Sequence, residues 1–72
     1  MQAAPAIAVT VNGAPHRLAA GATVADLVRE LGMQGSQVAV ERNKQLVRRG
    51  EHGSTPLADG DRIEVVTFFG GG

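Results

Sequence analysis

Apolar and polar residues alternate with a period of two near the start of the chain, which predicts a strand there. Residues 7–11 place Ile or Val at every second position, as in a strand with one buried face. Asn12-Gly13 follows directly, and both residue types tolerate the positive φ angles of a type I′ turn. The pattern therefore predicts a hairpin in which residues 14–19 return antiparallel to the first strand.

A helical period replaces this alternation in the next segment. Apolar residues stand at positions i, i+3, i+4 and i+7 of one stripe, namely Val24, Leu27, Val28 and Leu31. Thr23 is a good N-cap, and Asp26 stands three residues later as its capping-box partner. Gly32 is suited to end the helix in the left-handed conformation. A helix of roughly two to three turns is marginal alone, so it must pack on a sheet.

The second half of the chain predicts further strands. In order, they are a strand at residues 38–41, a turn at Asn43-Lys44, a short returning strand at 46–47 and a final strand at 62–68. Residues 48–58 show no regular period, and we expect an irregular crossing connection there. Asp59-Gly60-Asp61 is a turn signal directly before the final strand.

This order of elements predicts an α+β fold, in which one main helix packs on one face of a mixed four- to five-stranded sheet. It is the pattern of a β-grasp, or ubiquitin-like, domain, whose first and last strands pair in parallel at the centre. We expect a leader at residues 1–6, the domain at 7–69 and a flexible glycine tail at 70–72. The side chains expected to face the helix are Ile7, Val9, Val11, Val38, Val40, Ile63 and Val65.

The composition excludes several kinds of chemistry. The chain has 72 residues and no cysteine, so it forms one small domain without disulfides, thiolate metal sites or a thiol nucleophile. Seven Lys plus Arg balance seven Asp plus Glu, which gives no strong field to attract nucleic acid or a membrane. The pattern predicts neither a signal peptide nor a membrane span. We therefore expect a cytoplasmic protein.

The polar residues most often used in catalysis are better interpreted as structural here. His16 and His52 have no partners at ligand spacing, so we expect surface imidazoles and no metal site. Ser54 and Thr55 lack a base and are expected to bond backbone groups. The run Gly50-Glu51-His52-Gly53 lacks the lysine of a phosphate-binding loop. We expect no cofactor on this chain, with ATP bound by a partner.

Three glycines follow the final strand. Glycine leaves no Cβ to block entry into a narrow channel, and three extended residues reach about 10 Å. We predict that Gly70 and Gly71 carry the carboxylate of Gly72 into a partner's active site, where it is the reacting group. The alternative is an end without function.

Phe68 and Phe69 are the two aromatic residues of the chain, and they stand beside this tail. Adjacent strand residues point to opposite faces, so the two rings cannot enter the same core. If Val65 faces the helix, Val66 and Phe68 lie on the uncovered face. We consider Val66, Phe68 and Phe69 candidates for partner docking. The alternative is a Phe packed against a loop.

Arginines near the same end are further docking candidates. Arg48 and Arg62, with Arg49, are candidates for a basic rim that would meet an acidic partner surface. The alternative is solvated arginines whose aliphatic stems cover apolar edges.

Three runs closely resemble the ThiS family of sulfur carrier proteins in thiamine biosynthesis. They are Val38-Ala39-Val40-Glu41-Arg42-Asn43, Leu46-Val47-Arg48-Arg49, and Thr55 to Glu64 together with the glycine end. The resemblance implies that an E1-like (ThiF-like) enzyme uses ATP to adenylate the Gly72 carboxylate. It also implies that a sulfur-delivery system, such as a cysteine desulfurase, converts the adenylate to a thiocarboxylate. Thiazole synthase (ThiG-like) then accepts the sulfur, and the carrier is a cosubstrate rather than an enzyme.

Other interpretations remain open from sequence. The small subunit of molybdopterin synthase, or a carrier for cysteine or thionucleoside synthesis, shares the fold and the tail. A ubiquitin-like or TGS-like binding module would never have its tail activated, and a protein modifier would end in an isopeptide bond at Gly72. Three terminal glycines stand here, where many β-grasp carriers have two.

Overall fold

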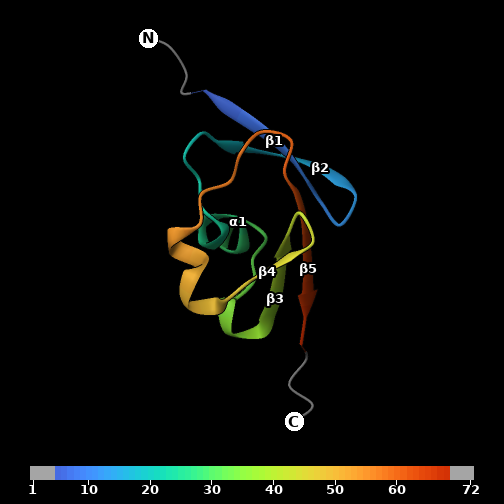
Figure 1. Ribbon diagram of the computed structural model, residues 1–72, viewed down its shortest axis with the longest axis vertical. Helices are drawn as coiled ribbons and strands as arrows, with labels where there is room; N and C mark the ends of the chain where they lie inside the picture. Colours follow the sequence, from blue (N-terminus) through green and yellow to red (C-terminus); the bar gives the residue numbers. More distant parts are fainter. Residues whose placement is uncertain (1–4, 69–72) are drawn as a thin grey trace.

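The computed structural model describes residues 5–68, which form one sheet with one main helix (Figure 1). The elements are β1 (Ala6–Val11), β2 (Ala14–Ala19), α1 (Val24–Glu30), the 3₁₀ helix η1 (Gly35–Gln37), β3 (Val38–Arg42), β4 (Gln45–Val47), the 3₁₀ helix η2 (Arg49–Ser54) and β5 (Arg62–Thr67). The strand order is β2-β1-β5-β3-β4. β1 and β5 pair in parallel, and the other neighbours are antiparallel. The predicted mixed sheet, with the first and last strands at its centre, is confirmed.

Both tight hairpins form where the sequence predicts them. Asn12 and Gly13 adopt φ angles of 51° and 84°, and Asn43 and Lys44 adopt 52° and 71°. Positive φ at both central positions matches the twist of the flanking strands. The first strand begins at Ala6, one residue earlier than expected.

Local signals set both ends of α1. The Thr23 hydroxyl accepts a hydrogen bond from the Asp26 N–H (3.2 Å), and the Asp26 carboxylate accepts one from the Thr23 N–H (2.9 Å). This is the predicted capping box. At the other end Gly32 has a φ of 74°, and the Met33 N–H donates to the Val28 carbonyl at 3.1 Å. The predicted end of the helix at Gly32, in the left-handed conformation, is therefore confirmed.

The core lies between α1 and one face of the sheet. Of the side chains expected to face the helix, Ile7 is partly buried and the others are buried. The core also contains Leu18, Ala22, Val24, Leu27, Val28, Val47 and Leu57. No helix within residues 5–68 is long and apolar enough to cross a membrane.

The connections hold more regular structure than the sequence indicates. The 3₁₀ helices η1 and η2 occupy segments for which we predicted no helix, because runs this short carry no readable period. Within the second connection, Ser54 and Thr55 donate hydrogen bonds to the Glu51 carbonyl (3.3 and 2.7 Å). Their predicted role in bonding the backbone is confirmed.

Candidate functional site

The central strand β5 leads directly to the predicted reacting end of the chain. It runs beside β3 in the middle of the sheet (Figure 1). The strand ends at Thr67, but the Phe68 N–H still donates to the Gln37 carbonyl at 2.7 Å. Phe69 and the glycines 70–72, which carry the predicted reactive tail, lie outside the described residues. The structure therefore places the root of the tail.

On the side of β5 that faces β1, the side chain of Asn12 continues the hydrogen bonding of the sheet. Backbone pairing between β1 and β5 ends at Val11 and Ile63. Beyond it, the Asn12 side chain accepts a hydrogen bond from the Val65 N–H (2.8 Å) and donates one to the Val65 carbonyl (3.1 Å). The Asn12 side chain thus makes the hydrogen bonds that one more residue of β1 would make through its backbone. Sequence reasoning assigned Asn12 only to the turn, since nothing local reveals a partner so far along the chain.

The face of the sheet opposite α1, called the open face below, exposes large apolar side chains. Val66 and Phe68 are each 57% exposed and Leu46 is 65% exposed. The expected exposure of Val66 and Phe68 is confirmed. Leu46 was missed, although the tight turn at Asn43-Lys44 already fixes which way it points. We call these three residues the apolar patch, and its role in partner docking stays a prediction.

The register of the strands places two acidic side chains, Glu41 and Glu64, beside this patch. Glu41 pairs with Leu46 on one side and with Glu64 on the other, and Ala39 pairs with Val66. No Lys, Arg or His of residues 5–68 forms an ion pair with Glu41 or Glu64 within 4.0 Å. Like charges placed directly opposite each other across two strands are unfavourable.

The candidate basic rim is exposed. Arg48 follows β4 with extended backbone, Arg49 begins η2, and Arg62 begins β5, and each side chain is accessible. Within the part of the chain that the structure describes, none lies within 4.0 Å of a carboxylate. A role in docking for these arginines stays a prediction.

A cavity of about 450 Å³ lies at the root of the tail, and we call it the end cavity. Its lining comes from the segment between α1 and η1, from η1, from the start of β3 and from the end of β5 with the residue after it: Leu31, Gly32, Met33, Gln34, Gln37, Val38, Thr67 and Phe68. Leu31 and Met33 also pack against the core. Sequence reasoning missed this cavity because the fold of the segment after α1 could not be predicted.

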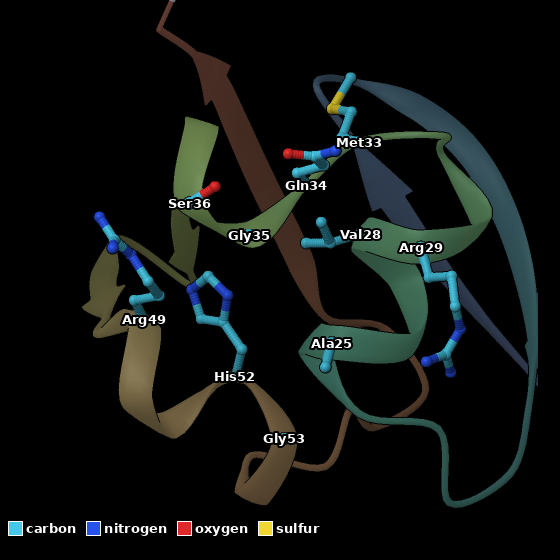
Figure 2. Close-up of a pocket in the computed structure, with 10 residues that line it drawn as sticks. All are labelled: Ala25, Val28, Arg29, Met33, Gln34, Gly35, Ser36, Arg49, His52 and Gly53. Carbon is cyan, nitrogen blue, oxygen red and sulfur yellow. The ribbon is translucent and has the colours of Figure 1, made fainter.

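His52 lies at a second cavity, of about 500 Å³, and is not the surface residue that we expected. The side chain lies at this cavity, between η2 and η1 (Figure 2), and only 5% of the residue is exposed. Its Nε2 stands 3.2 Å from the Val47 carbonyl, so this nitrogen carries the hydrogen and donates it. The predicted surface imidazole is wrong because η2 turns His52 inward. The other histidine, His16, is partly buried, and its Nε2 stands 3.5 Å from a Glu30 carboxylate oxygen.

A buried carboxylate holds the start of β5. Asp61 accepts hydrogen bonds from Arg42 Nε (2.8 Å), Asn43 Nδ2 (3.0 Å) and the Ala58 N–H (2.8 Å). Burial alone raises the pKa of Asp61, but these hydrogen bonds and the charge of Arg42 outweigh it and hold the pKa below its ordinary value of 3.8. The cluster joins the turn between β3 and β4 to the turn before β5.

Comparison with known proteins adds to this geometry. The sequence model of the ThiS family matches residues 9–72. A thiazole synthase from Magnetococcus marinus is 48% identical over 64 residues, which are 89% of this chain and 20% of that protein. The sulfur carrier protein ThiS of Thermus thermophilus is 38% identical over 64 residues, covering 89% of this chain and 98% of that protein. The chain thus spans about a fifth of the length of the thiazole synthases that it matches.

A solved structure agrees with this result. The crystal structure of the thiamine biosynthesis protein ThiS from Geobacter metallireducens superposes with a TM-score of 0.76 at 35% identity. The similarity covers 92% of this chain and 100% of that one. The β-grasp fold expected from the sequence is therefore confirmed.

Proposed function

Because this chain belongs to the ThiS family, we propose that it is a sulfur carrier protein of thiamine biosynthesis that carries sulfur on Gly72. The observation that carries this proposal is the family match, which extends through the glycine run to residue 72. The position of β5 supports it, because this central strand leads directly to residues 69–72.

The first step is activation of the Gly72 carboxylate. A carboxylate is a poor electrophile, since its charge repels nucleophiles and an oxide is a poor leaving group. An E1-like, ThiF-like partner therefore uses ATP to form the acyl-adenylate and releases pyrophosphate. The ATP belongs to this partner, and this chain supplies the acyl group.

The second step exchanges oxygen for sulfur. A sulfur-delivery system such as a cysteine desulfurase holds the sulfur as a persulfide, whose terminal sulfur attacks the adenylate and forms an acyl disulfide while AMP leaves. A thiol of the delivery system then attacks the other sulfur of that disulfide and forms a new disulfide with it, which releases Gly72 as a thiocarboxylate. A ThiG-like thiazole synthase then takes the sulfur and regenerates the carboxylate. The similarity to thiazole synthases supports this choice of acceptor.

This chain contributes binding and positioning to the cycle. The exposed side chains of Leu46, Val66 and Phe68 on the open face supply contact area to a partner, with Phe69, Arg48 and Arg62 as further candidates. Binding energy gained there holds the tail at the reacting centre. The docking surface and the reacting group are thus separate parts of one chain, and the partners perform the catalysis.

The test is loading of the chain by an adenylating enzyme, with ATP and a sulfur donor, followed by intact mass. We expect a mass gain equal to the replacement of one oxygen by sulfur. Since the chain has no cysteine, iodoacetamide treatment should then label the loaded chain and leave the unloaded chain unlabelled.

The matched control is the chain without Gly72, which should not load but should unfold at nearly the same temperature. No mass gain with an enzyme shown to load another carrier would overturn the proposal and favour a binding module.

A further inference from the structure

The open face combines exposed apolar side chains with an acidic pair. Glu64 precedes Val66 by two residues on β5, so its side chain points to the same face as that of Val66. Glu41 pairs with Glu64 across β3 and β5, and it pairs with Leu46 across β3 and β4. Each carboxylate is thus the direct neighbour of an apolar side chain: Glu41 of Leu46, and Glu64 of Val66.

The two carboxylates lack a cationic partner among the described residues. Both glutamates are exposed, and no Lys, Arg or His of residues 5–68 forms an ion pair with either within 4.0 Å. Arg62 stands two residues before Glu64 on the same face, but it too lies beyond this distance. Cβ atoms directly opposite each other on two strands are about 4.5–5.5 Å apart, where like charges are unfavourable. A cation from outside the chain would relieve this repulsion.

We propose that the open face binds a partner protein whose docking surface presents an arginine, surrounded by apolar side chains, to Glu41 and Glu64. This partner chemistry rests on the proposed function and adds to it what the surface of the partner carries. Arginine suits the pair because its planar guanidinium presents a fork of N–H donors that matches the geometry of carboxylates. Since the two glutamates are directly paired, one guanidinium can bond both carboxylates.

The apolar patch determines how much this charge pairing matters. A partner that covers Leu46, Val66 and Phe68 also removes water from the neighbouring carboxylates. Opposite charges attract more strongly where water is excluded, whereas a carboxylate covered without a partner costs free energy. A partner surface that is entirely apolar, or acidic at this place, would therefore bind poorly. The apolar patch supplies contact area, and the acidic pair selects the partner.

The test is calorimetric titration of the full chain into an E1-like adenylating enzyme without ATP, so that docking is measured apart from sulfur transfer. The variants are Glu41→Gln, Glu64→Gln and the two combined. The matched control is Glu51→Gln, an exposed glutamate on η2, which packs near α1 rather than on the open face. We expect Kd to rise at least about tenfold in the double variant and to stay unchanged in Glu51→Gln.

Salt provides a second readout of the same charges. Raising the salt concentration from about 0.05 M to about 0.5 M should weaken binding of the unmodified chain more than binding of the double variant, because salt screens charge pairs that are partly exposed. Thermal unfolding separates docking from folding. Removing one of two opposed like charges relieves their repulsion, so Glu41→Gln and Glu64→Gln should unfold at the same temperature as the unmodified chain or slightly above it.

Three results would overturn the inference: binding of the double variant as tight as that of the unmodified chain, no binding by either, or gel filtration in which the isolated chain pairs with a second copy through the open face. The proposed function is judged separately. A chain that docks with the expected charge dependence but gains no sulfur mass contradicts the sulfur-carrier function alone. A chain that gains the mass but binds independently of Glu41 and Glu64 contradicts this inference alone.

Discussion

Replacing Asp61 tests how the fold holds the start of the strand that carries the reactive tail. Asp61 is 6% exposed and accepts three hydrogen bonds, from Arg42, Asn43 and the Ala58 N–H. The change Asp61→Ala removes all three acceptor contacts at once. Asp61→Asn keeps the shape of the side chain but removes its charge.

The size of the loss follows from these contacts. Breaking a buried ion pair by removing one partner costs roughly 3–5 kcal/mol. The lower end applies here, because the Arg42 side chain is 36% exposed and regains water. We therefore expect Asp61→Ala to lower the free energy of unfolding by about 3 kcal/mol. Asp61→Asn should lower it by about 2 kcal/mol, since hydrogen bonds to a charged group are worth roughly 1.5–3 kcal/mol.

This loss is large relative to the whole domain. A chain of 72 residues has a free energy of unfolding of about 4–11 kcal/mol at roughly 0.05–0.15 kcal/mol per residue. Both variants should nevertheless remain folded in the absence of denaturant if the domain has average stability. Urea unfolding followed by circular dichroism measures the difference.

The pH dependence has a definite sign. The pKa of Asp61 is lower in the folded chain than its ordinary value of 3.8. The folded state therefore holds fewer protons than the unfolded state, so the charge of Asp61 adds stability above about pH 4. That stability is lost as the pH falls through the folded pKa. The pKa of Asp26 is also lowered, but Asp26 contributes equally to both chains and cancels from the comparison.

The difference between the unmodified chain and Asp61→Asn should therefore stay constant down to about pH 4 and shrink as the pH falls further. A double-mutant cycle with Arg42→Ala isolates the ion pair from the other two contacts. A difference that also stays constant below about pH 4, or an Asp61→Ala loss below about 1 kcal/mol, would refute the assignment of this cluster as a buried, charge-stabilised anchor.

Two further predictions concern buried His52 and the exposed side chains of Leu46 and Phe68. His52→Ala should lower the melting temperature by roughly 8–16 °C, since losing the ring and its bond to the Val47 carbonyl costs about 2 kcal/mol; an unchanged melting temperature would place His52 at the surface. Leu46→Ala and Phe68→Ala should each change the free energy of unfolding by less than about 0.5 kcal/mol. Each should weaken binding to the adenylating partner at least about tenfold by calorimetric titration, whereas a large stability loss with unchanged binding would place that side chain in the core.

Much of the fold could be predicted because its signals are local. The capping box of Thr23 and Asp26 and the stop at Gly32 depend on residues within one or two turns of each other. The same holds for the turn at Asn12-Gly13, whose φ angles follow from the residue types. Alternation identified the buried side of each long strand, since a strand has only two faces.

The exposed apolar side chains show where such local signals are no longer sufficient. Val66 and Phe68 were placed correctly by alternation along β5. Leu46 was missed because β4 is only three residues long, too short to show a period by itself. Its exposure depends on pairing with Glu41 across a turn.

Other features depend on contacts between residues far apart in the chain. Asn12 bonds Val65 across 53 positions, and Arg42 reaches Asp61 across 19. His52 is buried because η2 packs near α1 and η1, and the end cavity exists because the chain turns after Gly32. The period and residue types of the sequence determined the elements and their buried faces, since these depend on neighbouring residues. The tertiary structure alone decided which distant groups meet, because that depends on the path of the whole backbone.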